Sequence, residues 1–115
     1  MKKLSNKIDI NTIKEKELFQ MWNSIAPILK FKYIVDERSV DGAIANKYKF
    51  DFEGLLINEF KIHKEFIYPT ILVNGYSSST DYNGETKRIL IIDDKIMYDY
   101  LRMFIRNIDE RKKLS

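Results

Sequence analysis

The 115-residue sequence contains no cysteine. Disulfide bonds, thiolate metal sites and cysteine nucleophiles are therefore all excluded. A chain without cysteine fits a reducing compartment, so we expect a cytoplasmic protein.

Long hydrophobic runs are also missing. The longest apolar stretches, residues 66–73 and 89–92, are far shorter than the roughly 20 residues that a membrane helix needs. Polar residues interrupt the chain soon after Met1-Lys2-Lys3-Leu4, whereas a signal peptide continues with about 7–15 apolar residues. We therefore expect neither export nor a membrane partner.

Glycine and histidine are too scarce for the common catalytic motifs. The four glycines are widely separated and match neither the Walker nor the dinucleotide-binding pattern. His63 is the only histidine, so there is no histidine pair for zinc, and no nucleophile-elbow pattern accompanies it. We expect no metal and no cofactor, and a non-enzymatic function is favoured over an enzymatic one.

Charge of one sign is in small excess. Twenty Lys and Arg residues against 17 Asp and Glu residues give a net charge of +3, and most charges alternate in sign along the chain. Basic residues gather near the C-terminus as Arg102, Arg106, Arg111 and Lys112. They are a candidate basic surface for nucleic acid, and the alternative is an ordinary solvated tail.

What the sequence does contain is enough apolar surface for one folded domain, with 44% hydrophobic residues. We expect a polar lead-in over residues 1–11, a single globular domain over 12–108 and a charged tail over 109–115. A capping box at Thr12 and Glu15 predicts a helix to about Ala26, which Pro27 should end or kink. Asp93 or Asp94 should cap a C-terminal amphipathic helix.

Between these helices, alternating and β-branched segments predict strands. Residues 48–52 show the clearest alternation, and residues 31–35 are a further candidate. For residues 55–63 both strand and helix fit, and strand is preferred. Residues 67–73, which contain Pro69, are expected to pair with residues 87–92. The predicted fold is therefore α+β: a small antiparallel sheet of four to five strands with an N-terminal and a C-terminal amphipathic helix.

Asp51 and the pair Glu59 and Lys61 form one candidate catalytic constellation. Placed on adjacent strands, they resemble the PD-(D/E)XK nuclease pattern. That resemblance implies a divalent metal held by Asp51 and Glu59, with Lys61 helping to activate water. The alternative interpretation is solvent-facing charges that pair across a hairpin.

The polar segment 74–84 is a candidate binding loop, bounded by the turn dipeptides Asn74-Gly75 and Asn83-Gly84. Tyrosines offer a large contact area at low entropic cost, so a recognition surface there would use Tyr76, Ser78, Asp81 and Tyr82. The two tyrosines could instead stack on bases, and the plain alternative is a long hairpin loop.

The frequent Lys, Ile, Asn and Tyr residues resemble proteins encoded by AT-rich phages and mobile elements. We therefore predict a non-enzymatic structural, assembly or protein-interaction subunit, such as a phage-type virion component located in the host cytoplasm or the virion. Its partners would be other protein subunits, including copies of itself. The alternatives are a nucleic-acid-binding accessory or regulatory protein and the small metal-dependent nuclease.

Overall fold

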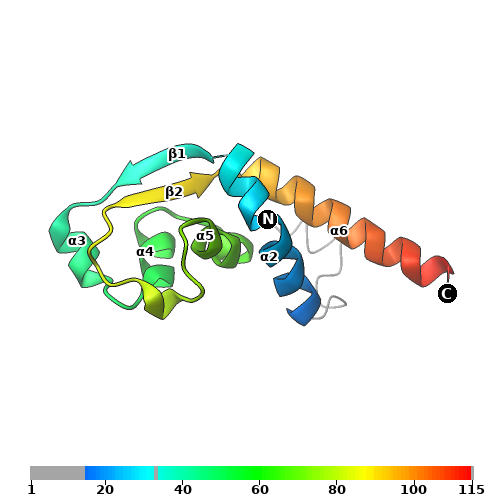
Figure 1. Cartoon of the computed structure of the whole chain (residues 1–115), viewed down its shortest axis with the longest axis horizontal. Helices are drawn as coiled ribbons and strands as arrows, with labels where there is room; N and C mark the ends of the chain where they lie inside the picture. The colour runs from blue at the N-terminus through cyan, green and yellow to red at the C-terminus, as the bar shows by residue number, and fades with distance from the viewer. Residues whose placement is uncertain (1–14, 33, 115) are drawn as a thin grey trace.

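The computed structural model describes residues 15–32 and 34–114 of the chain (Figure 1). Within them it has five α-helices: α2 (Glu15–Lys32), α3 (Gly42–Lys47), α4 (Phe52–Asn58), α5 (Ile67–Val73) and α6 (Asp94–Leu114). Two short 3₁₀ helices, η2 (Lys64–Phe66) and η3 (Ser79–Asp81), lie on either side of α5 in the sequence. The two strands are β1 (Ile34–Ser39) and β2 (Arg88–Ile92).

The predicted sheet of four to five strands is wrong. The described residues form a mostly helical fold with one two-stranded antiparallel sheet, in which Ile34 pairs with Ile92 and Ser39 with Arg88. Residues 88–92 are a strand, as predicted, but their partner is β1, whereas the predicted partner, residues 67–73, is helix α5.

Two further predicted strands are helical or turn segments. Residues 48–51 join α3 to α4, which begins at Phe52, and most of the 55–63 segment belongs to α4 or to the turn that follows it. Asp51 caps α4 because its carboxylate accepts a hydrogen bond from the Gly54 backbone N–H at 3.0 Å. A side chain at Gly54 would push the Asp51 carboxylate out of this cap, because a Cβ there would lie 2.3 Å from Asp51 Oδ2.

The two long helices agree with the sequence pattern. Helix α2 continues past Pro27 to Lys32, so the predicted end near Ala26 is wrong, and the capping box at Thr12 lies outside the described residues. Asp93 caps α6, since its carboxylate accepts a hydrogen bond from the Lys95 backbone N–H at 3.1 Å. Helix α6 then runs on to Leu114, so residues 109–114, expected as a tail, belong to its last turns.

Helix α5 is the centre of the fold and contacts α2, α4 and β2. In Figure 1 the β1–β2 ribbon and the short helices α3, α4 and α5 form one end of the molecule, and α6 extends toward the other. One apolar cluster joins α2, α5 and α6 around Trp22 and Phe66, and a second joins α3, α4, α5 and β2 around Phe52 and Tyr82. No helix among the described residues is both long and apolar enough to span a bilayer.

Candidate functional site

An open groove of about 560 Å³ lies where α2, α4 and α5 meet the loop that follows α5. This volume is in the range of protein binding pockets, roughly 300–1,000 Å³. We call it the α2–α4–α5 groove. Its apolar residues are Phe19, Ile57, Ile62, Ile67, Tyr68 and Ile71, and its polar residues are Glu53, Lys64, Ser77, Ser78 and Ser79.

The α2 side of the groove is built by an aromatic pair. The rings of Phe19 and Tyr68 lie 4.6 Å apart between centroids. Asn23, one helical turn after Phe19, donates a hydrogen bond from Nδ2 to the Tyr68 hydroxyl at 2.9 Å. Phe19 nevertheless remains 40% exposed. This wall therefore offers a fixed aromatic surface to the solvent.

The α4 side is held by the core and exposes one aliphatic side chain. Leu55 and Leu56 are fully buried and fix the helix against the rest of the domain. Ile57 follows them on the outer face and is 40% exposed. Ile67 and Ile71 of α5, both nearly buried, complete the apolar lining.

The third wall is the serine segment of the predicted binding loop, Ser77–Ser79. The Asp81 carboxylate accepts hydrogen bonds from the backbone N–H groups of Ser77 at 2.9 Å and Ser78 at 3.2 Å. These bonds hold the pKa of the Asp81 carboxyl below its usual range. The Glu53 backbone N–H donates to Ser79 Oγ at 2.8 Å and ties the loop to α4. The loop wall is therefore arranged before any partner arrives.

The two tyrosines of the predicted loop face the protein interior. Tyr82 is fully buried against Phe52, and its hydroxyl donates to the Thr86 carbonyl at 2.7 Å. Burial raises the pKa of the Tyr82 hydroxyl. Tyr76 also packs on Phe52 and donates to Thr86 Oγ1 at 3.0 Å. Of the four predicted loop residues, Ser78 reaches the groove, while Asp81 and the tyrosines support the loop.

The residues of the nuclease-like pattern flank α4 and do not lie on adjacent strands. Asp51 precedes the helix as its cap, and Glu59 follows it. Glu59 Oε2 accepts a hydrogen bond from the Tyr48 hydroxyl at 2.9 Å, which raises the pKa of Tyr48. Lys61 lies in the turn after α4 with a φ of 56°. The described residues contain no group of three or more His, Asp or Glu side chains that could hold a metal ion.

The predicted basic surface lies on α6. Arg102 forms an ion pair with Asp99 at 3.2 Å, and its guanidinium lies 5.8 Å from the centre of the Tyr98 ring. Arg106 is exposed, and the side chains of Arg111 and Lys112 lie outside the described part of the structure. Nucleic-acid binding through this helix stays a prediction.

His63 has a local partner of its own. Its Nδ1 forms a hydrogen bond with the Glu65 carboxylate, and its ring lies 6.4 Å from the Tyr98 ring. A smaller hollow of about 400 Å³ opens nearby, where Asp36 and Arg38 of β1 lie close to Asp94. Burial raises the pKa of Asp94, and the neighbouring His63 opposes that shift. Asp36 and Arg38 already pair with each other at 2.8 Å, and Lys61 and Asp93 also line the hollow.

Comparison with protein-family models, curated proteins and solved structures finds no match for this chain. The functional interpretation therefore depends on the groove itself. Sequence reasoning missed Phe19 and Ile57. The sequence did contain a signal for Phe19. The apolar stripe of α2 consists of Leu18, Trp22, Ile25 and Leu29, and Phe19 lies beside it. A large apolar residue outside the buried stripe of a helix is expected to be exposed and available for binding.

Proposed function

We propose that this chain is a non-enzymatic protein-interaction subunit that binds an apolar segment of a partner protein in the α2–α4–α5 groove. The observation that carries the proposal is an open apolar groove whose three walls are fixed by internal contacts. Its concrete form is a subunit of a larger assembly, such as a phage-type virion component, acting in the cytoplasm or in the virion.

The chemistry of the groove favours the apolar face of an amphipathic helix. Phe19 of α2 and Ile57 of α4 expose apolar surface in the groove, with Ile67 and Ile71 of α5 more deeply buried. Grooves between helices commonly accept a helix that inserts apolar side chains one turn apart. Around this apolar surface lie Ser77–Ser79, Glu53 and Lys64, which can bind the polar edge of such a helix.

The fixed walls strengthen this interpretation. Binding costs entropy whenever a loop or side chain must be ordered at the interface. Here the Asn23 amide already positions Tyr68, and the Asp81 carboxylate already positions the serine segment. A partner would therefore meet a surface that needs little rearrangement.

The experiment is a selection of displayed random peptides on the wild-type protein, with binding then measured against Ile57→Arg. Because Ile57 is 40% exposed, an arginine there can turn into the solvent and leave the fold intact. We expect the enriched peptides to carry apolar residues at i, i+3 or i+4 spacing and to lose at least about tenfold in affinity for Ile57→Arg, a difference of roughly 1.4 kcal/mol.

The matched control is Met103→Arg, which introduces the same charge at an exposed apolar side chain of α6 outside the groove. Peptides should bind this variant as they bind the wild type. Peptides that bind Ile57→Arg with unchanged affinity, or a selection that enriches nothing, would contradict the proposal.

A further inference from the structure

We propose that the occupant of the α2–α4–α5 groove is a second copy of this chain, which inserts Phe31 and Ile28 from the end of its own α2. This inference rests on the proposed function, because it names the partner of the same groove. It begins from Phe31, whose side chain is 92% exposed in the last turn of α2. Ile28, three residues earlier, is 43% exposed. We call these two residues the Phe31 patch.

The Phe31 patch cannot fill the groove of its own molecule. Phe19, which lines the groove, and Phe31 lie on the same helix and are separated by 12 positions. At 1.5 Å per residue, that separation is about 18 Å along the axis of α2. A rigid helix holds the two sites apart, so the patch can reach only the groove of another molecule.

The two surfaces are different in shape. The patch is one helical turn of α2 with a phenylalanine that is almost fully exposed, and the groove is a hollow lined by α2, α4, α5 and the loop that follows α5. A contact between unlike surfaces of identical chains is head-to-tail. Each molecule would then use its groove for one neighbour and its Phe31 patch for the next, which produces a ring or a filament.

Charge on the two surfaces selects one orientation. Lys30 and Lys32 lie on either side of Phe31 in the sequence, and both are exposed. The groove has Glu53 on the α4 side and Lys64 at the start of η2. Docking that brings the lysines of the patch toward Glu53 is attractive, and docking that brings them toward Lys64 is repulsive.

The test mixes two variants that each lack one half of the contact. Phe31→Gln removes the patch and keeps the groove, and Ile57→Arg blocks the groove and keeps the patch. We expect the wild type to form oligomers whose mass by sedimentation velocity rises with concentration, and we expect each variant alone to be a monomer. An equimolar mixture should form a dimer and nothing larger, because only one patch and one groove remain in that pair.

A second mixture tests the predicted attraction between Lys30 and Lys32 of one copy and Glu53 of the next. Glu53→Lys should weaken self-association of the 115-residue chain, and adding a Lys30→Glu/Lys32→Glu variant should restore binding to it. The second-copy inference would be overturned if Phe31→Gln alone or Ile57→Arg alone associated as strongly as the wild type. It would also be overturned if the mixture of these two variants stayed monomeric. A wild type that is a monomer at every concentration would overturn it as well.

Failure of this inference and failure of the proposed function are distinguishable. If the selected peptides bind the groove while the wild type stays monomeric, the groove takes another protein and only the second-copy inference is overturned. If no peptide depends on Ile57 and no mixture associates, both proposals fail.

Discussion

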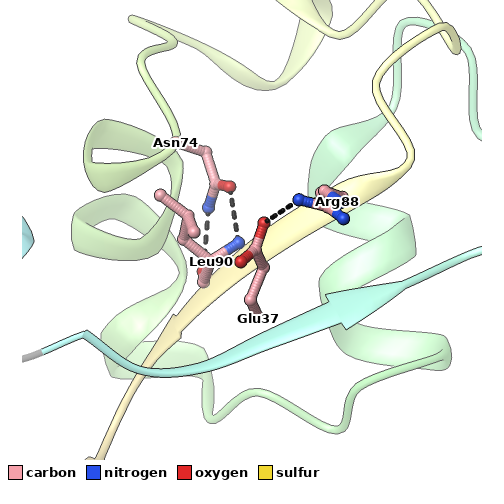
Figure 2. A network of polar contacts seen from close by, with 4 residues as sticks. All are labelled: Glu37, Asn74, Arg88 and Leu90. Atoms are coloured by element: carbon pink, nitrogen blue, oxygen red, sulfur yellow. Dashed lines mark hydrogen bonds and ion pairs between the residues drawn. The ribbon is translucent and has the colours of Figure 1, made fainter.

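The side-chain amide of Asn74 pairs with both backbone groups of Leu90 (Figure 2). Asn74 Nδ2 donates to the Leu90 carbonyl at 3.0 Å, and the Leu90 N–H donates to Asn74 Oδ1 at 2.8 Å. The side chain therefore takes the place of a neighbouring strand at this position of β2. On the other side of β2, β1 supplies Glu37, which pairs with Arg88 at 3.4 Å. The predicted pairing of residues 67–73 with β2 is thus replaced by a single amide at the end of helix α5.

We expect Asn74→Ala to lower the free energy of unfolding by about 1–3 kcal/mol, because it leaves two partly buried backbone groups of Leu90 without partners. Asn74→Asp should cost at least as much, since a carboxylate cannot donate to the Leu90 carbonyl. Urea unfolding, followed by the emission of Trp22, measures both, because Trp22 is the only tryptophan and is buried. Asn83→Ala is the control, since Asn83 is exposed; equal losses for Asn74→Ala and Asn83→Ala would contradict the role of this amide.

Phe50 lies in a backbone conformation that phenylalanine rarely adopts. Its φ is 64°, in the left-handed region, and its side chain is 57% exposed. Glycine has no Cβ to strain there, and the left-handed conformation costs other residues roughly 1–2 kcal/mol. We expect Phe50→Gly to raise the free energy of unfolding by about 1 kcal/mol, measured by urea unfolding. Phe50→Ala keeps the strain and should be no more stable than the wild type. A Phe50→Gly variant less stable than the wild type would contradict the prediction, and a loss shared by Phe50→Ala would show that the ring stabilises the turn.

This conformation also explains why the sequence predicted a strand at residues 48–52. Tyr48 and Phe52 are buried, but Phe50 between them is exposed, so burial does not follow the alternation of the sequence. The chain turns at Phe50 between two short helices and sends Tyr48 and Phe52 into the core. Periodicity over so few residues cannot separate a strand from such a turn. The Asp51 cap, with Gly54 three residues later, was the local signal for a helix start.

Pro69 misled the prediction for residues 67–73 in a similar way. In a strand it indicates an edge, but it is also acceptable in the first turn of a helix, where backbone N–H groups lack an intrahelical partner. The structure uses the second option, since α5 begins at Ile67. By contrast, α2 and α6 could be predicted because their apolar stripes extend over several turns.

The groove could be predicted only in part. Ser78 belongs to the predicted binding loop and does line the groove. Phe19 lies on α2, which was predicted as a helix, but the rest of the apolar lining comes largely from α4 and α5, which the sequence pattern favoured as strands, so these side chains could not be brought together. A site formed by three elements distant in sequence requires the correct fold before its residues can be recognised.

The pH dependence of stability should reveal the role of Asp81. Its pKa is lowered in the folded protein by the backbone N–H groups of Ser77 and Ser78, from an ordinary value of 3.8. A carboxyl with a lowered folded pKa stabilises the fold above its unfolded pKa, and this contribution disappears as the pH falls through the folded value. We expect wild type and Asp81→Asn to differ most above about pH 5 and to converge in more acidic solution. Urea midpoints measured across this range test it, and a constant difference at every pH would contradict it.

Tyr82 should act on stability and not on binding. Tyr82→Phe keeps the buried ring and removes the hydrogen bond to the Thr86 carbonyl, so we expect a loss of about 1 kcal/mol in unfolding free energy. Groove-binding peptides should keep their affinity for the folded variant, because Tyr82 does not line the groove. Peptide affinity measured by isothermal titration provides the check, and Ile57→Arg is the comparison that should lose binding. Equal losses in peptide affinity for Tyr82→Phe and Ile57→Arg would show that Tyr82 takes part in binding after all.

Substitutions at Asp51 distinguish a helix-capping role from the nuclease-like interpretation. A serine can also cap a helix, whereas alanine cannot, so Asp51→Ser should stay close to the wild type in stability and Asp51→Ala should lose about 1 kcal/mol. A metal-dependent nuclease that uses this carboxylate would be inactivated by both changes. The two roles therefore predict different results for wild type, Asp51→Ser and Asp51→Ala. A capping role separates serine from alanine in urea unfolding, whereas a catalytic role makes both variants inactive in a Mg²⁺-dependent DNA cleavage assay. We expect a stability difference between serine and alanine and no cleavage by any of them; wild-type cleavage that both substitutions abolish would instead assign Asp51 to a catalytic site.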